Sequence, residues 1–555
     1  IRYDGDNSGY ALQLLSKQDD DLFRSLYTDI ESSRLFRDRG IRNFVEGTFF
    51  SWYCESNSSA VAEGLRRILS TIVQYIFPTV HTVHVTDTIK HLYENLVPEP
   101  LRKNIGEFYT PEWLVEFTLD QVGYTGEEIL GKKILDPTCG SGNFLIHAIQ
   151  RYKQQAFSQD IADEQVLEEI VDNIVGFDLS PLAVLAARLN YLLHISDLLA
   201  DRQEIEIPVY MADAIYAPTV EDEVEDQIRR YRVGTHYGDV ELALPEMLVQ
   251  DRRKFDLVLE QTEECIEGHM EPPAFFACLQ SALNSVESED HLDDWRPYLL
   301  DMYEKILDLE LKNWNRIWCR VIRNYFASIS IGKVNFVVGN PPWVRWSELP
   351  VDYRERVKPT CDRFNIFSET PFFGGNELDI SAIVSYSVAD KWLENGGKMS
   401  FVITKIHFQA PSSEGFRRFV LPDGTPLCVT EVHDWERVRP FPKLANKPVV
   451  FVWEKGFPTG SPTPWFLWHR RGNVRIREGS SWAEVEPMLF SERLNAIALP
   501  QDGRWSILSP GHTHLVELLS GKSESYAGRK GITTDLNGAY FVRINGPGSR
   551  PGTLN

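Results

Sequence analysis

The residues Asn340-Pro341-Pro342-Trp343 place a carboxamide, a rigid turn and a large aromatic ring directly after a short apolar run, Asn335–Gly339. The Asn340 side-chain oxygen and the Pro341 carbonyl oxygen can accept both hydrogens of an exocyclic amine, which would orient the nitrogen lone pair for attack. Trp343 can stack on a base taken out of a duplex. The same residues could also form only a proline-rich turn with a packed tryptophan, so the surrounding sequence has to decide between the two interpretations.

Three acidic residues upstream each stand at the end of a candidate strand: Asp136, Asp178 and Asp213. Asp136 can accept from an ammonium group, Asp178 from ribose hydroxyls and Asp213 from an adenine amino group. The turn Gly140-Ser141-Gly142 after Asp136 would let the backbone approach a ligand closely. One such acid alone is more often a helix N-cap. Three at successive strand ends predict a site for an adenosine that carries an amino acid.

The elements that must position these residues alternate between strands and helices. From about residue 101, short apolar runs alternate with helical stretches, which is typical of a doubly wound, mostly parallel α/β sheet of the Rossmann type. The last two strands are joined by the proline-rich turn Arg439–Pro442, which predicts an antiparallel hairpin on the sheet edge. The helical stretches are Asn143–Tyr152, Pro181–Ile195 and Ile380–Glu394. The candidate strands are Lys133–Asp136, Ile174–Asp178, Ile207–Ala212, Phe336–Gly339, Lys398–Ile403, Leu427–Asp434 and Pro448–Glu454.

Composition and spacing divide the chain into three predicted parts. Residues 1–100 have the apolar spacing of a helical N-terminal domain, as in Ala60–Ile76 and Asp87–Leu96. Residues 101–456 form the α/β domain. The step from Asp213 to Asn340 is far longer than the roughly 30 residues of one βαβ unit, so residues 219–330 are predicted to be a mostly helical, acidic insertion. Residues 457–555, rich in Pro, Gly and Trp, are interpreted as a linker and the start of another domain.

Charge and cysteine content limit the function classes. A net charge of −23 argues against a general nucleic-acid binder, but the acidity is concentrated in the insertion, and residues 456–555 are mildly basic. The seven cysteines are scattered without a Cys-x-x-Cys pair, which favours a cytoplasmic protein with free thiols over a disulfide or zinc protein. For the histidine cluster His81, His84 and His91, a solvated or capping role is favoured over a metal site. No apolar run is long enough to span a membrane.

In the order and spelling of its motifs, the sequence resembles the gamma class of amino-methyltransferases that act on DNA. The segment Gly106–Pro111 is similar to the one preceding that family's cofactor motif, and the resemblance covers roughly residues 101–456. It implies S-adenosylmethionine as cofactor and the N6 atom of adenine as the methylated position, with no metal. Leu378-Asp379-Ile380 and Met399–Ile403 look like later motifs that flank the base pocket.

The resemblance also assigns roles to individual residues. The catalytic set would be Asn340, Pro341, Pro342 and Trp343, although the family often has Tyr or Phe where Trp343 stands. The cofactor-binding residues would be Tyr109, Thr110, Pro111, Asp136, Pro137, Gly140, Gly142, Asn143, Phe144, Asp178, Leu179, Asp213 and Ala214.

The long insertion resembles the larger single-chain enzymes of restriction and phage-defence systems (type IIG or ISP restriction, BREX or DISARM). Lys530–Tyr540 is similar to the entry of the target-recognition domain in those enzymes. The resemblance implies double-stranded DNA as the partner, other defence-system proteins as further partners, and site-specific methylation of a flipped-out adenine.

Other functions stay open on the sequence. Cytosine-N4 methylation uses nearly the same chemistry, and the chain could be the methylase half of a nuclease-methylase fusion. Only Asp308–Lys312 loosely fits a metal-dependent nuclease core, and it lies in an amphipathic helical run. Enzymes that methylate a protein glutamine or guanine N2 of RNA share the Asn-Pro-Pro-aromatic pattern but are typically compact. A DNA-binding module with an inactive site is disfavoured because all three acids and Asn340 are present.

Overall fold

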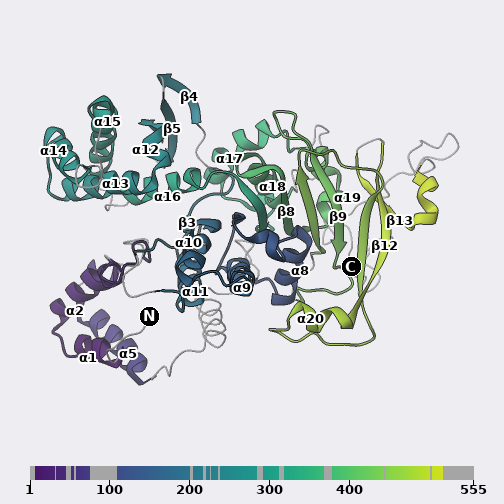
Figure 1. Cartoon of the computed structure of the whole chain (residues 1–555), viewed down its shortest axis with the longest axis horizontal. Helices are drawn as coiled ribbons and strands as arrows, with labels where there is room; N and C mark the ends of the chain where they lie inside the picture. Colours follow the sequence, from purple (N-terminus) through teal and green to yellow (C-terminus); the bar gives the residue numbers. More distant parts are fainter. Residues whose placement is uncertain are drawn as a thin grey trace, which may run out of the picture.

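A ten-stranded sheet organises the chain, with an all-helical region at one end of the sequence and a separate strand-and-helix module in its middle (Figure 1). The computed structural model describes residues 7–31, 33–45, 52–55, 58–74, 109–199, 204–216, 220–225, 227–235, 238–283, 292–311, 318–367, 378–442, 444, 446–500 and 503–516. The predicted helix Asp87–Leu96, the histidines 81, 84 and 91, Gly106–Phe108 and Lys530–Tyr540 lie outside the described residues.

One half of the sheet is parallel, with strand order β8-β7-β1-β2-β3. Its strands are almost wholly buried, as expected when helices cover both faces of a parallel sheet. The predicted α/β fold class is confirmed. The strands are β1 (Ile134–Asp136), β2 (Ile174–Asp178), β3 (Val209–Met211), β7 (Val334–Gly339) and β8 (Leu393–Thr404).

The other half of the sheet adds mostly antiparallel strands, in the order β13-β12-β11-β9-β10. β9 and β10 form the predicted antiparallel hairpin, but its predicted position on the sheet edge is wrong, because β11 pairs with β9 and carries two further strands. The sheet therefore runs across the boundary that the sequence placed at residues 456–457. The strands are β9 (Leu427–Asp434), β10 (Pro448–Lys455), β11 (Thr463–Arg470), β12 (Leu489–Ala498) and β13 (Trp505–Leu508).

Successive residues of each central strand point into opposite cores, as the period of two requires. Leu135 and Val337 belong to a core shared with α17 and α18, whereas Ile134 and Val338 belong to a core shared with α8, α9, α10 and α11. The helices are α8 (Glu112–Val122), α9 (Asn143–Ser158), α10 (Asp163–Asn173), α11 (Pro181–Ile195), α17 (Val351–Arg363), α18 (Ser381–Lys391) and α19 (Ile406–Gln409).

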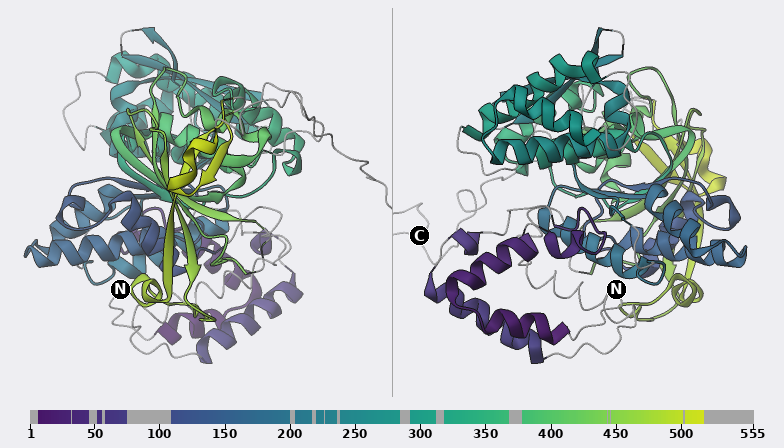
Figure 2. Two further views of the ribbon diagram at one scale, coloured as in Figure 1. Left: turned by 90° about the vertical axis from the view of Figure 1, so that its right-hand side faces the viewer. Right: turned by 60° about the vertical axis from the view of Figure 1, so that its left-hand side comes forward.

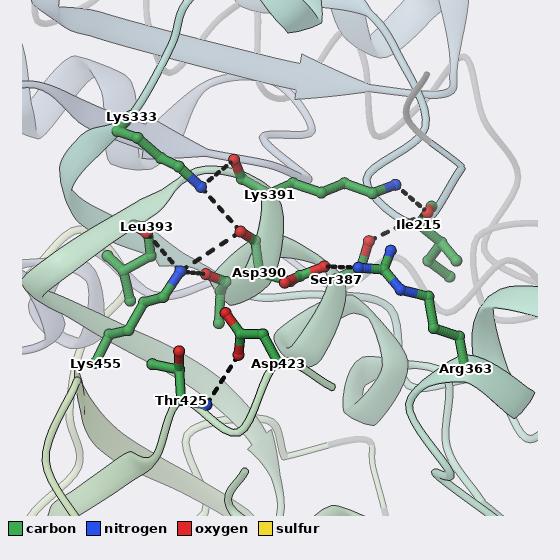
Figure 3. Close-up of polar contacts among 11 residues, drawn as sticks. Ile215, Lys333, Arg363, Ser387, Asp390, Lys391, Leu393, Asp423, Thr425 and Lys455 are labelled. Atoms are coloured by element: carbon green, nitrogen blue, oxygen red, sulfur yellow. Dashed lines mark hydrogen bonds and ion pairs between the residues drawn. The ribbon is translucent and has the colours of Figure 1, made fainter. Parts of the chain in front are cut away.

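Lysine side chains hold the C-terminal end of α18, where the last carbonyl groups lack helical partners (Figure 3). Lys455 Nζ donates to Ala389 O at 2.7 Å and to Leu393 O at 2.9 Å, and Lys333 Nζ donates to Asp390 O at 3.0 Å. Burial lowers the pKa of Lys455 to about 8. Positive charge at a helix C-terminus is favourable, so these contacts fix α18 against the amino-terminal edge of the sheet.

A separate module occupies the segment between β3 and β7, at the upper left of Figure 1. It has its own hydrophobic core, which runs from Tyr231 to Phe326. The sequence predicted a mostly helical segment and missed its three-stranded antiparallel sheet. The elements are β4 (Val220–Glu225), β5 (Ile228–Thr235), β6 (Gly238–Pro245), α12 (Glu246–Gln250), α13 (Arg252–Glu267), α14 (Pro272–Leu283), α15 (Leu292–Leu311) and α16 (Trp318–Ser330).

The N-terminal helices form a small bundle around Leu14, Leu22 and Leu26. α5 corresponds to the predicted helix Ala60–Ile76, whose last two residues lie outside the described residues. In the part of the chain that the structure describes, no helix has the length and apolar character needed to cross a bilayer. The helices are α1 (Asn7–Leu15), α2 (Asp19–Leu26), α3 (Arg34–Arg37), α4 (Trp52–Glu55) and α5 (Ser59–Gln74).

Candidate active site

The carboxyl ends of β1, β2 and β7 bring several predicted site residues together. Asn340 Nδ2 donates to Thr110 Oγ1 at 3.1 Å, although 230 positions separate the two residues in the sequence. Asn143 Nδ2 donates to the Thr110 carbonyl oxygen at 2.9 Å, which ties the start of α9 to the same segment. Parallel strands expose their carboxyl ends at one edge, and ligands of open α/β sheets bind there.

Asp136 is a buried carboxylate with one oxygen unused. Its Oδ1 accepts from Thr138 N at 3.1 Å, while its Oδ2 is buried and has no hydrogen-bond partner among the described residues. Burial raises the pKa of the Asp136 carboxyl well above its usual range, and the nearby Asp178 raises it further. An unpartnered buried acceptor is costly, so this oxygen is suited to a cationic ligand group.

Two positions at this edge require glycine, one of them beside Asp136. A Cβ on Gly339 would lie 2.8 Å from Asp136 Oδ1, so any other residue at position 339 would force the Asp136 side chain or the backbone to shift. Gly142 has φ +88° at the start of α9, and a Cβ there would lie 3.3 Å from Ala187. Both positions need glycine for a physical reason.

Asp178 does not cap α11, whose N-cap is Ser180, and its carboxylate instead joins its own turn to the glycine turn. It accepts from Ser180 N at 2.8 Å and from Gly140 N at 2.9 Å. Burial raises the pKa of this carboxyl as well. A second acceptor lone pair on each oxygen is still available to hydroxyl donors.

Asp213 is held by α17, which the sequence did not anticipate. Tyr353 Oη donates to its Oδ2 at 3.2 Å, and Arg356 Nη2 donates to the same oxygen at 3.2 Å. Oδ1 accepts from the backbone N–H groups of Ile215 and Tyr216 at 2.8 and 3.1 Å. The Arg356 guanidinium also lies over the Tyr216 ring, 5.2 Å from its centroid. Any further donor must therefore share Oδ2 with Arg356.

Trp343 is more buried than its proposed stacking role suggested. Only 7% of the residue is exposed, and Nε1 donates to Val402 O at 3.2 Å. Phe441 packs against it edge to face, with ring centroids 5.1 Å apart. Phe441 was not among the predicted site residues, although its place as an aromatic residue in the proline-rich turn after β9 could have indicated it.

Asp379 joins the continuation of the Asn340 turn to the end of β8. Ile380 N donates to Val344 O at 2.9 Å, and Thr404 Oγ1 donates to Asp379 Oδ2 at 3.3 Å. Burial raises the pKa of Asp379 to about 7. These contacts place Asp379 beside the segment that follows the Asn340 turn; that Leu378–Ile380 flanks a base pocket stays a prediction.

The other predicted positions differ in exposure. Leu179 is 53% exposed, whereas Phe144 is packed in the core. Among the described residues, no group of three or more His, Cys, Asp or Glu is arranged to hold a metal ion. The remaining positions are Tyr109, half-buried; Pro111, at the start of α8; Pro137 and Ala214, both buried; and Pro341 and Pro342, buried and half-buried.

Two solved structures and two curated relatives are similar to the chain. The first structure, the DrdV–DNA complex, has a TM-score of 0.45 at 13% identity and covers 87% of this chain and 40% of that one. The second, the ATP-dependent type ISP restriction-modification enzyme LlaBIII bound to DNA, has a TM-score of 0.47 at 13% identity, over 87% and 29% of the two chains. The adenine-specific methyltransferase PglX of Streptomyces coelicolor is 35% identical over 108 residues, which are 18% of this chain and 9% of that protein. The methylase subunit of the type I restriction enzyme EcoEI of Escherichia coli is 30% identical over 125 residues, 22% of each chain.

The matched segments therefore span less than a quarter of either curated relative. Family models match more of the chain. The N-6 DNA methylase model matches residues 84–228, and the Eco57I restriction-modification methylase model matches residues 172–434. Together they cover β1 to β9, with Asp136, Asp178, Asp213 and Asn340. The chain belongs to the N6-adenine DNA methylase family.

Proposed function

We propose that this chain transfers a methyl group from S-adenosylmethionine to the N6 atom of an adenine that is flipped out of double-stranded DNA at a specific sequence. The observation that carries the proposal is the juxtaposition of two groups at one sheet edge. Asp136 offers a buried, unpartnered oxygen, and the neighbouring strand ends at Gly339, next to the Asn340 carboxamide. A restriction-modification or phage-defence system is the proposed setting.

The residues at this edge fit the proposed cofactor. Asp136 Oδ2 would accept from its ammonium group, and the Gly140–Gly142 turn leaves room for its methionine part near Tyr109, Thr110 and Pro111. Asp178 would accept from the ribose hydroxyls. Asp213 Oδ2 would accept from the adenine amino group, beside Arg356. S-adenosylmethionine, when bound, supplies an electrophilic methyl group with a neutral leaving group.

The chain's own contribution to the reaction is orientation. Asn340 Oδ1 and the Pro341 carbonyl oxygen would accept from the two hydrogens of the target amine, which aims its lone pair and stabilises the charge that develops on nitrogen. Thr110 fixes the carboxamide by accepting from Nδ2, so that Oδ1 is the atom presented to the amine. No strong base is needed, because the amine loses its proton during or after transfer.

Base stacking at Trp343 requires a rearrangement. Phe441 covers part of the ring in this structure, so the flipped base would displace it or slide beside it. Stacking on an aromatic side chain contributes about 1–3 kcal/mol, which offsets part of the few kcal/mol that flipping costs.

The test is a methyl-transfer assay with labelled S-adenosylmethionine on unmethylated DNA, followed by mass spectrometry of the nucleosides. We expect N6-methyladenine with the wild type and none with Asn340→Ala. The variant should keep the wild-type melting temperature and cofactor affinity. If the label appeared in N4-methylcytosine instead, the target base would be cytosine and not adenine. Absence of cofactor binding by calorimetry would refute the proposal.

A further inference from the structure

Two turns on the C-terminal half of the sheet leave it at the same edge as the Asn340 turn. β8 ends at Thr404, which pairs with Pro448 at the start of β10. Val449, the next residue of β10, pairs with Asp434 at the end of β9, so β8 and β9 end at the same edge. β11 runs parallel to β9, with Leu467 opposite Asp434. The segments after β9 and β11 therefore both start at the carboxyl edge. Figure 2 shows β11 and β12 running past the other strands toward α20 (Trp482–Val485).

These two turns are rich in basic residues. Residues 435–447 contain four basic residues and one glutamate, and residues 468–480 contain four arginines and one glutamate, a net of +3 each in a chain of net −23. We call the five exposed arginines of these turns the arginine rim. The arginine rim is Arg437, Arg439, Arg471, Arg475 and Arg477.

The rim is attached to the candidate site rather than merely near it in sequence. Arg470, next to Arg471, donates to the carbonyl oxygen of Val438, so the two turns are joined between Arg437 and Arg439. Ile476 and Trp482 pack against the same core as Trp343 and Phe441. Arg439 stands two residues before Phe441, whose ring contacts Trp343.

The glutamate of the first turn pairs with lysines and not with the arginine rim. Glu436 accepts from Lys447 at 2.6 Å and from Lys405 at 3.2 Å, so its charge is already matched by two lysines. Within the described residues, Arg437, Arg475 and Arg477 form no ion pair. Exposed, unneutralised arginines next to a candidate site in an otherwise acidic protein indicate a surface for a polyanion.

We propose that the arginine rim binds the phosphate backbone of the DNA duplex beside the flipped adenine. This inference rests on the proposed function, because it places the target base at the Asn340 turn. A duplex presents one phosphate charge per roughly 1.7 Å of its axis, so DNA whose base enters there brings several phosphates over both turns. The planar guanidinium fork suits phosphate oxygens, and backbone contacts fix the register of the duplex without reading its sequence.

The test measures binding of a fluorescein-labelled, unmethylated duplex of mixed sequence by anisotropy at several KCl concentrations. The variant is Arg437→Ala/Arg475→Ala/Arg477→Ala in the 555-residue chain. The matched control removes the same charge from exposed arginines of α2, α5 and α15, as Arg24→Ala/Arg67→Ala/Arg296→Ala. A lysine version of the rim variant keeps the charge and should restore most of the binding.

Each phosphate contact contributes about 0.9 to the slope of log K against log [salt]. For the rim variant, which lacks three arginines, we expect the magnitude of this slope to fall by about 2–3. Its Kd for the duplex should be at least tenfold higher than that of the wild type near 0.1 M salt, while its melting temperature and cofactor affinity stay unchanged. A rim variant that binds like the control, or wild type that does not bind the duplex, would overturn the inference. If the wild type binds the duplex through the rim but transfers no methyl group to unmethylated DNA in the methyl-transfer assay, the proposed function is overturned, whereas the rim remains a surface that binds the phosphate backbone.

Discussion

Replacement of Asp136 by asparagine separates the charge of this buried residue from its shape. The wild-type Oδ2 is buried and has no hydrogen-bond partner among the described residues, so the proposed cofactor ammonium would supply both a donor and a counter-charge. A hydrogen bond to a charged group contributes about 1.5–3 kcal/mol, and 1.4 kcal/mol is a factor of ten in affinity. Asp136→Asn should therefore weaken S-adenosylmethionine binding about 10- to 100-fold in calorimetry at pH 7.5.

The same substitution should stabilise the ligand-free protein. The folded-state pKa of Asp136 is raised above its unfolded value. The wild type therefore loses stability as pH rises from the ordinary carboxyl range through the folded-state pKa, because the unfolded chain releases the proton first. Asp136→Asn has no carboxyl group to titrate at this position. The difference in free energy of unfolding between the variant and the wild type should therefore grow in favour of the variant as pH rises through this range.

The control is Asp423→Asn, which removes an equal charge from an exposed turn away from the site (Figure 3). It should leave both cofactor affinity and the pH dependence near those of the wild type. Our reasoning about Asp136 is refuted if Asp136→Asn binds the cofactor within threefold of wild type, or if its stability falls with pH as the wild type's does.

Three further predictions concern other contacts. Thr110→Val removes the oxygen that accepts from the Asn340 carboxamide. A hydrogen bond of this kind contributes about 0.5–1.5 kcal/mol, so its loss should lower kcat about 2- to 10-fold in the methyl-transfer assay. An unchanged kcat would show that this hydrogen bond does not orient the carboxamide. Arg356→Ala removes a donor that competes for Asp213 Oδ2, so cofactor affinity by calorimetry should rise severalfold; weaker binding would mean that Arg356 orients the carboxylate instead. Lys455→Met leaves the buried carbonyls of Ala389 in α18 and Leu393 at the start of β8 without this donor, and it should lower the free energy of unfolding by about 1–3 kcal/mol. The folded-state pKa of Lys455 is lowered to about 8, so the wild type should gain more stability than the variant as pH rises from 8 toward the unfolded value of about 10.4. Lys391, whose pKa is also lowered to about 8, contributes equally to both proteins; parallel denaturation profiles for the two proteins would contradict the prediction.

The sequence by itself determined the fold class, the positions of the central strands and the edge at which the acidic residues gather. These features are local: an apolar run of a few residues, an acid at its end and a glycine turn into a helix each leave a pattern within about ten positions. β1 and β2 match the predicted strands to within a residue, because buried parallel strands are short and bounded by residues that cannot continue them.

Only the tertiary structure decided which side chains meet. The contacts from Asn340 to Thr110 and from Arg356 to Asp213 join residues 230 and 143 positions apart, and no local period encodes such a pairing. The burial of Trp343 under Phe441 and the continuation of the sheet through β11 likewise depend on long-range packing. Local spacing fixes where a side chain can point, whereas its partners are set by how separate segments fill the same core.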